Sequence, residues 1–205
     1  MRGMVKRSRG ASISSRPSSW WRRFALLGIL AAGFALRLIR LGADSLWYDE
    51  TVSVMLAAKS IPDMLAHTAG DIHPPLYYAL LHLWGRLAGL GEFSAAFLSL
   101  FFGVLLIALT YQFGRWAAGP DAGLLAAFLA SISPFPLWYS QEVRMYTLGA
   151  CLGLAALWGL RRALRGGAGS GWGWAIYALA AAAGMYTLYY FAFLLLTLNV
   201  WALCV

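Results

Sequence analysis

Apolar segments separated by short polar connections make up most of the chain. They lie at 20–41, 74–90, 93–115, 122–139, 146–164, 172–188 and 191–205. A membrane-spanning helix needs about 20 mostly apolar residues, and most of these segments approach that length. One longer polar connection, 42–73, follows the first segment and carries two helix-like patches, 51–58 and 61–68. The pattern predicts an all-α, polytopic transmembrane protein with about six spans.

Composition supports the same class. The chain is 61% hydrophobic, with a mean hydropathy of +0.67 and 10 Trp, 10 Tyr and 11 Phe, as is typical of integral membrane proteins. The net charge of +8 could suggest a nucleic-acid partner. Many of the basic residues, however, gather before or at the start of the first apolar segment, as in a cytoplasmic tail. We therefore expect a membrane and no nucleic acid as partner.

The N-terminus divides into two regions. Residues 1–19 are rich in Ser, Arg and Gly and are predicted to form a disordered, basic, cytoplasmic tail. Residues 20–205 are predicted to form one transmembrane domain, in which 42–92 is the first extracytoplasmic loop. The apolar run 24–41 could also belong to a cleaved signal peptide, but it is long enough to span, which favours an uncleaved anchor.

The charge clusters discriminate between two topologies. If 74–90 spans the membrane, the basic stretch 161–165 falls outside, against the positive-inside tendency. If 74–90 lies in the interface, Arg115 and 161–165 fall inside and the segment 140–146 falls outside. We therefore expect 74–90 to be interfacial, although its length still allows a span. The acidic positions of both outer loops then share one extracytoplasmic face of the cytoplasmic membrane.

The pattern within 74–90 agrees with an interfacial helix. It opens with Pro74 and Pro75, a helix start signal. Tyr78, His82 and Arg86 recur every four residues and form one polar stripe. A helix with one polar and one apolar face lies on a membrane more readily than it crosses one.

Asp49 and Glu50 are the first candidates for chemistry. They follow Trp47 and Tyr48, aromatic residues of the kind that favour the membrane–water interface. A carboxylate in this place can act as a general base toward a hydroxyl, or can hold a divalent ion. The alternative is structural, because both residues precede the helix-like patch 51–58 and would stabilise a helix N-terminus.

His73 is the second candidate. It stands before Pro74, which disfavours the helical conformation and places the imidazole on a stiff turn. From there it could bind a phosphate, or a metal together with Asp49. The alternative is an interfacial histidine without a function.

The segment 140–146 is the third candidate. Glu142 and Arg144 stand between two apolar segments, where ionisable groups are costly and are usually paired or functional. A guanidinium suits a phosphate group. The alternative is a surface ion pair between these two residues.

Arg37 and Arg40 stand at the outer end of the first apolar segment, against the positive-inside tendency. Two interpretations stay open for them. Either they reach the outer lipid headgroups, or they help to attract an anionic lipid substrate.

Three motifs together resemble a known family. They are LWYDETVSV (46–54), HPPLYYALLHLWGRLAG (73–89) and SQEVRMYTL (140–148). In this order they resemble the N-terminal part of the polytopic GT-C glycosyltransferases. The resemblance is to the bacterial dolichyl-phosphate-mannose–protein mannosyltransferase-like family, which includes the lipid A aminoarabinose transferases, and it covers about residues 24–200. The 205 residues would then be the N-terminal part of a longer enzyme.

The resemblance implies a function and a site. The enzyme would move a sugar from a polyprenyl-phosphate donor to an acceptor hydroxyl on the extracytoplasmic face, with inversion. Asp49 and Glu50 would be catalytic, and the substrate would contact His73, Glu142, Arg144 and Tyr146. A divalent cation, Mg²⁺ or Mn²⁺, is a further expectation, with Asp49 and Glu142 as ligands.

Two other classes of function stay open from the sequence. One is a subunit of a transporter or flippase, and the other is an inactive membrane remnant that assembles with a partner chain. The candidate residues argue for the enzyme, because they gather at one outer surface, whereas transporters place ionisable groups near the middle of the membrane. The sequence does not define the oligomeric state.

Overall fold

A computed structural model describes residues 20–167 and 169–204, and every regular element in these ranges is a helix. The helices are α1 (Trp20–Leu38), α2 (Tyr48–Ala58), α3 (Ile61–Thr68), α4 (Leu76–Ala88), α5 (Glu92–Ala118), α6 (Pro120–Ile132), α7 (Pro134–Tyr139), α8 (Tyr146–Leu164), α9 (Ser170–Met185) and α10 (Phe191–Cys204). The all-α prediction is thereby confirmed, and both helix-like patches of the long connection are helices. The predicted tail, 1–19, lies outside the described residues.

One apolar segment that was predicted to be continuous is interrupted in the structure. The apolar run 122–139 forms two helices, α6 and α7, which meet at Ser133. Pro134 causes the break because it has no backbone N–H and excludes the helical conformation at the residue before it. Ser133 accordingly has an extended backbone, with φ −62° and ψ 128°.

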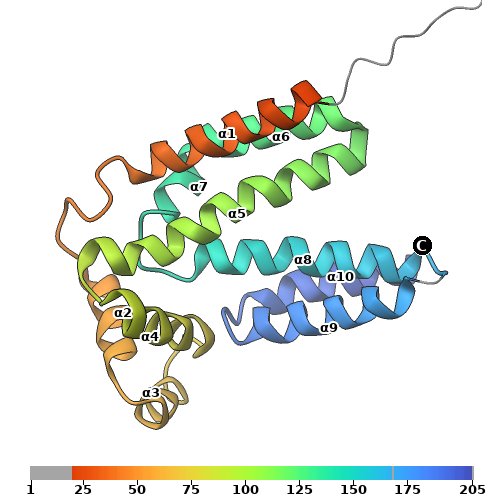
Figure 1. The fold of residues 1–205 in the computed structure, drawn as a ribbon. Helices are drawn as coiled ribbons and strands as arrows, with labels where there is room; N and C mark the ends of the chain where they lie inside the picture. The colour runs from red at the N-terminus through yellow and green to blue at the C-terminus, as the bar shows by residue number, and fades with distance from the viewer. Residues whose placement is uncertain (1–19, 168, 205) are drawn as a thin grey trace, which may run out of the picture.

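The helices form two groups and a cap (Figure 1). Helices α1, α5 and α6 lie in one group, and α8, α9 and α10 lie side by side in the other. Helices α2, α3 and α4 gather at one end of both groups, together with the connections 140–145 and 186–190. We call this the cap end. The opposite end, where α1 begins and the α5–α6 and α8–α9 connections turn, is called the basic end.

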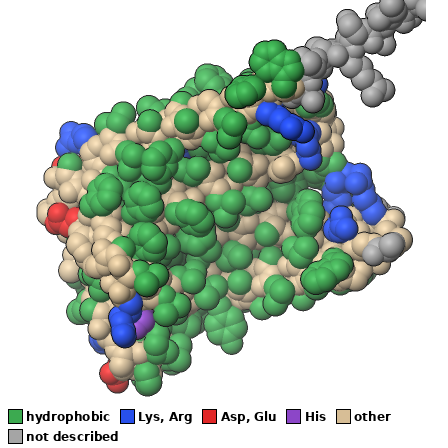
Figure 2. All heavy atoms as spheres, viewed as in Figure 1, with side chains coloured by type: hydrophobic (Ala, Val, Ile, Leu, Met, Phe, Trp, Pro, Cys, Tyr) green, Lys and Arg blue, Asp and Glu red, His purple; other side chains and the backbone are tan. Residues whose placement is uncertain are grey.

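Charge separates along the molecule (Figure 2). The described acidic residues belong to the cap end apart from Asp121, which lies in the first turn of α6. The basic end carries Arg22, Arg23, Arg115, Arg161, Arg162 and Arg165. Between the ends, hydrophobic side chains cover the visible face. A belt of this kind with charge at its two ends is typical of a protein that contacts lipid.

Among the described residues, α5 is the one helix that is both long and apolar enough to cross a membrane by itself. Helices α6 and α10 are apolar but shorter. The polytopic arrangement therefore stays a prediction. Helix α4 lies in the cap and is 13 residues long, about 20 Å, which is short for a span. The interfacial position of 74–90 stays a prediction.

Glycines allow two helix pairs to approach closely. A Cβ atom on Gly114 of α5 would lie 2.8 Å from the carbonyl oxygen of Ala122 in α6. A Cβ atom on Gly159 of α8 would lie 2.6 Å from the backbone nitrogen of Tyr177 in α9. Small residues at such crossings are how helices pack in a membrane, where burial of apolar surface no longer drives association.

Arg37 supports the break between α6 and α7. It is fully buried and donates from Nη1 to the Ser131 carbonyl at 3.1 Å and from Nη2 to the Ala130 carbonyl at 3.3 Å. These carbonyls lie in the last turn of α6, where no further helical N–H reaches them. Its Nε also donates to Ser140 Oγ at 3.0 Å, which fixes the start of the 140–145 connection. Because its guanidinium is buried among these partners, Arg37 is not placed to reach lipid headgroups or to attract an anionic lipid substrate.

Arg40 differs from Arg37 in its environment. It is exposed and pairs with Asp44 at 3.0 Å, and both side chains stay in solvent. Such a pair adds little to stability. Arg37 and Arg40, for which the sequence allowed the same two interpretations, therefore have different roles.

Replacement of Arg37 by Met is expected to destabilise the fold by about 3 kcal/mol, because several buried carbonyl oxygens lose a charged donor. The matched variant, Arg40→Met, is expected to change stability by less than about 1 kcal/mol. Thermal unfolding of both variants in detergent micelles measures the difference. Equal melting temperatures for the two variants would contradict the role given to Arg37.

Candidate active site

A cavity of about 500 Å³ opens at the cap end, between the start of α2, the α3–α4 connection and the loop before α8. Its apolar wall includes Val52, Met55 and Ile72. Its polar and aromatic wall includes Tyr48, Asp49, Asp71, His73, Tyr78 and Arg144. The cavity can therefore hold a ligand that combines charged, hydroxyl-bearing and apolar parts.

The two adjacent acids at the start of α2 have different environments. Glu50 is buried, and its Oε2 accepts from the Trp47 N–H at 3.2 Å while its Oε1 accepts from the Val143 N–H at 2.8 Å. Glu50 thus caps α2 and binds it to the loop before α8, and this geometry does not support a catalytic role. The side chain of Asp49 is 39% exposed and lines the cavity.

A buried hydrogen-bond chain fixes the loop that carries Arg144. Ser99 of α5 donates its hydroxyl proton to the Arg144 carbonyl at 3.0 Å. The Tyr77 hydroxyl, 2.8 Å from Ser99 Oγ, must then be the donor in that contact. Thr147 adds a bond from its hydroxyl to the Ser99 carbonyl at 3.1 Å. Helices α4, α5 and α8 therefore share one anchor beneath the cavity.

The Arg144 guanidinium is buried yet loosely held. Its Nη2 lies 3.6 Å from Asp49 Oδ2, 3.2 Å from His73 Nε2 and 3.5 Å from the Tyr146 hydroxyl. Charge-assisted hydrogen bonds are usually about 2.7–2.9 Å long. Its Nε is buried without a partner among the described residues. The guanidinium thus keeps capacity to bind an anion from the cavity.

The contact with Arg144 defines the state of His73. Arginine only donates, so His73 Nε2 must accept and the ring is neutral, with its proton on Nδ1. Partial burial and the charge of Arg144 lower the pKa of His73, and the carboxylates of Asp71 and Asp49 oppose that shift. Nδ1 lies 4.0 Å from Asp71 Oδ1, which favours this tautomer.

Tyr78 and Asp71 line the cavity and were not among the predicted site residues. Tyr78 was assigned only to the polar stripe of α4, and burial raises its pKa to about 12, so its hydroxyl stays protonated. Asp71 was not selected, although its carboxylate accepts from the Ile72 N–H at 2.6 Å and faces the cavity. The spacing of Asp71 two residues before His73 is the signal that could have identified it.

Two further predicted residues, Tyr146 and Glu142, do not line the cavity. Tyr146 contacts Arg144, whose guanidinium carbon lies 5.6 Å from the centre of the tyrosine ring. Glu142 accepts from the indole N–H of Trp138, and partial burial raises its pKa, whereas that hydrogen bond lowers it. The structure therefore brings Asp49, His73 and Arg144 together at the cavity and gives Tyr146 a supporting position.

Comparison with protein families gives an independent result. Residues 72–205 match the sequence model of the family described as dolichyl-phosphate-mannose-protein mannosyltransferase. The chain belongs to this family. Membership supports a glycosyltransferase of the GT-C type in a membrane-associated family, as the motifs suggested. Comparison with curated proteins and with solved structures finds no match.

The family match covers only part of the cavity. It includes His73, Glu142, Arg144 and Tyr146 and begins after Asp49. The link between Asp49 and the matched region therefore comes from the structure, in which α2 is bound to the loop before α8.

The residues present do not fit a divalent cation well. In the described ranges, no three His, Cys, Asp or Glu side chains come close enough to form a ligand set. Mg²⁺ and Mn²⁺ prefer several oxygen ligands. Asp49, one expected ligand, faces Arg144, and Glu142, the other, accepts from Trp138.

Lowering the pH below about 6.5 is expected to destabilise the wild type more than a His73→Gln variant. The pKa of His73 is lower in the folded protein than in the unfolded chain, so the unfolded chain binds more protons in this range. The contribution of neutral His73 to stability is fully present above the pKa of the unfolded chain, and it is lost as the pH falls through the lower pKa of the folded protein. Thermal unfolding of both proteins from neutral to mildly acidic pH measures this, and identical pH dependence would contradict it.

Proposed function

We propose that the chain transfers a sugar from a polyprenyl-phosphate donor to an acceptor hydroxyl on the extracytoplasmic face of the cytoplasmic membrane. The observation that carries the proposal is the meeting of Asp49 and Arg144, 3.6 Å apart, on the wall of the cap-end cavity. One group can accept a proton and the other can bind a phosphate. Family membership supplies the reaction class, glycosyl transfer.

Arg144 and its neighbours suit the donor phosphate. A buried guanidinium that has an unpaired Nε among the described residues and holds its other partners at long distances can bind a phosphate strongly. The protonated hydroxyl of Tyr78 and the Nδ1–H of His73 are further donors at the same cavity. As the sugar leaves, negative charge grows on the phosphate, and fixed donors in a site of low dielectric stabilise that charge.

Asp49 suits the acceptor. In the proposed step, the acceptor oxygen attacks the anomeric carbon and Asp49 takes the hydroxyl proton. The bond between that carbon and the phosphate oxygen breaks, and the electron pair leaves with the lipid phosphate. Inversion of the anomeric carbon, expected from the family resemblance, follows from this single displacement.

The position of the cavity supports a lipid-borne donor. Its lining residues belong to α2, α3, α4 and their neighbouring loops at the cap end, and Figure 1 shows these helices next to the ends of both helix groups. A polyprenyl chain in the membrane would bring its phosphate to this level. Helix α4 is tied to the α9–α10 turn, since Leu76 N–H donates to the Tyr186 carbonyl at 2.9 Å, so both helix groups hold the cap in place.

A transfer assay tests the proposal. Membranes that carry the 205-residue chain are incubated with radiolabelled polyprenyl-phosphate sugars, and label on an acceptor is measured. We expect transfer with at least one donor, and photo-crosslinking of the donor to the chain as a readout that does not need turnover. Crosslinking without transfer, together with movement of the intact donor across the bilayer, would favour a flippase. Absence of both crosslinking and transfer with every donor would contradict the proposal.

A further inference from the structure

Two adjoining cavities lie at the basic end, away from the candidate active site. One, of about 630 Å³, is lined by Leu109, Phe113, Trp116, Ala155, Trp158 and Ile176, with polar groups at Gln112, Arg115 and Arg161. The other, of about 230 Å³, is lined by Trp158, Arg161, Arg162, Arg165, Gly166 and Gly169. Trp158 and Arg161 belong to both, so an apolar space and an arginine-rich space adjoin.

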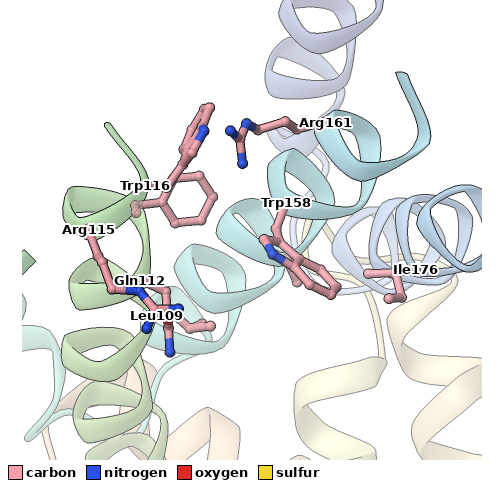
Figure 3. A pocket seen from close by; sticks show the side chains of 9 residues that line it. Leu109, Gln112, Arg115, Trp116, Trp158, Arg161 and Ile176 are labelled. Atoms are coloured by element: carbon pink, nitrogen blue, oxygen red, sulfur yellow. The ribbon is translucent and has the colours of Figure 1, made fainter. Parts of the chain in front are cut away.

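Arg161 lies where the two spaces meet (Figure 3). It extends from α8 toward Trp116 of α5, and its guanidinium carbon lies 3.5 Å from the centre of that ring. Arg162 lies over Trp158 at 5.7 Å. Stacking on indole rings holds the arginines in place and leaves the N–H groups at their edges free to bind an anion.

The three arginines around the smaller cavity, Arg161, Arg162 and Arg165, lack carboxylate partners in the described part of the chain. The acid found there, Asp121, is bound by Arg22 through Nε at 2.9 Å and Nη2 at 3.0 Å. No ion pair between described residues involves Arg161, Arg162 or Arg165. Their positive charge is therefore available to an external anion.

We propose that this end binds one anionic phospholipid of the membrane, with its phosphate on Arg161, Arg162 and Arg165 and an acyl chain in the apolar space between α5 and α8. The adjoining polar and apolar spaces match a head and a tail. A basic pocket between helices at the cytoplasmic surface is a favourable site for an anionic headgroup. This inference rests on the proposed membrane location and not on the proposed reaction.

Native mass spectrometry of the whole chain in detergent micelles tests the inference without any transfer reaction. Dioleoyl phosphatidylglycerol is added, and the bound fraction is compared with that of zwitterionic dioleoyl phosphatidylcholine. We expect one retained phosphatidylglycerol, and roughly fivefold weaker binding for each of Arg161→Gln and Arg165→Gln. Arg86→Gln, an exposed arginine in the cap, is the matched control and is expected to bind as the wild type does.

The two variants separate binding from folding. Arg161→Gln removes the stacking on Trp116, whereas Arg165→Gln changes an exposed side chain at the rim and leaves that stacking intact. Unaltered binding in Arg165→Gln and Arg161→Gln would overturn the inference, and so would equal retention of the two lipids. Displacement of the lipid by an equal concentration of glycerol 1-phosphate would also overturn it, because the site would then recognise a soluble phosphate.

Discussion

Asp49→Asn is expected to reduce sugar transfer by at least about a hundredfold. The amide keeps the shape of the side chain and cannot take a proton from the acceptor. Donor binding is expected to be unchanged or tighter, because a negative charge leaves the vicinity of the donor phosphate and of Arg144. Transfer is measured with radiolabelled donor, and binding by photo-crosslinking, so that the effect is assigned to kcat and not to KM.

Two other acids provide controls for this result. Asp44→Asn removes an exposed carboxylate of the same connection outside the cavity, and it is expected to leave transfer unchanged. Glu50→Gln removes a buried acceptor of two backbone N–H groups and is expected to lower the melting temperature. Asp49→Asn is expected to melt as the wild type does, and persistent transfer in that variant would contradict its role as base.

The helices could be predicted from the sequence because each one depends on local pattern. Apolar runs, Pro74 and Pro75 before α4, and acids at the start of α2 identified the helices with small errors at their ends. The prediction of one continuous segment at 122–139 was wrong because it relied on the uniform apolar character of the run and neglected Pro134. A proline inside an apolar run is a stronger signal for a break than hydropathy is for continuity.

The division of labour within the site could not be predicted, because it depends on distant contacts. Asp49 and Glu50 are adjacent in sequence and equally acidic, and only the position of the Val143 N–H makes Glu50 structural. Arg37 likewise has no local sign of burial, since two of the three carbonyls it binds belong to α6 and only that of Gly33 lies in its own helix. The sequence did predict that the loops carrying Asp49 and Glu142 lie at the same end of the molecule. That prediction came from the number of apolar segments between them and from the positions of the basic residues.

Arg144→Lys is the second variant with a large expected effect. Lysine keeps the positive charge but loses the planar fork, so it binds a phosphate through a single point. We expect transfer to fall by about a hundredfold or more, with donor binding weakened by at least tenfold, because the lost contacts serve both the bound donor and the leaving phosphate. Transfer and photo-crosslinking are measured on the same membranes.

The same variant discriminates between a binding role and a structural one. The backbone carbonyl of Arg144, held by Ser99, is unaffected by the change, so the loop is expected to stay in place and the melting temperature to fall little. Arg86→Lys, an exposed arginine of α4, controls for the change of residue type and is expected to transfer normally. A strongly lowered melting temperature with normal donor binding in the surviving protein would make Arg144 a structural residue and would leave the donor phosphate without its principal partner.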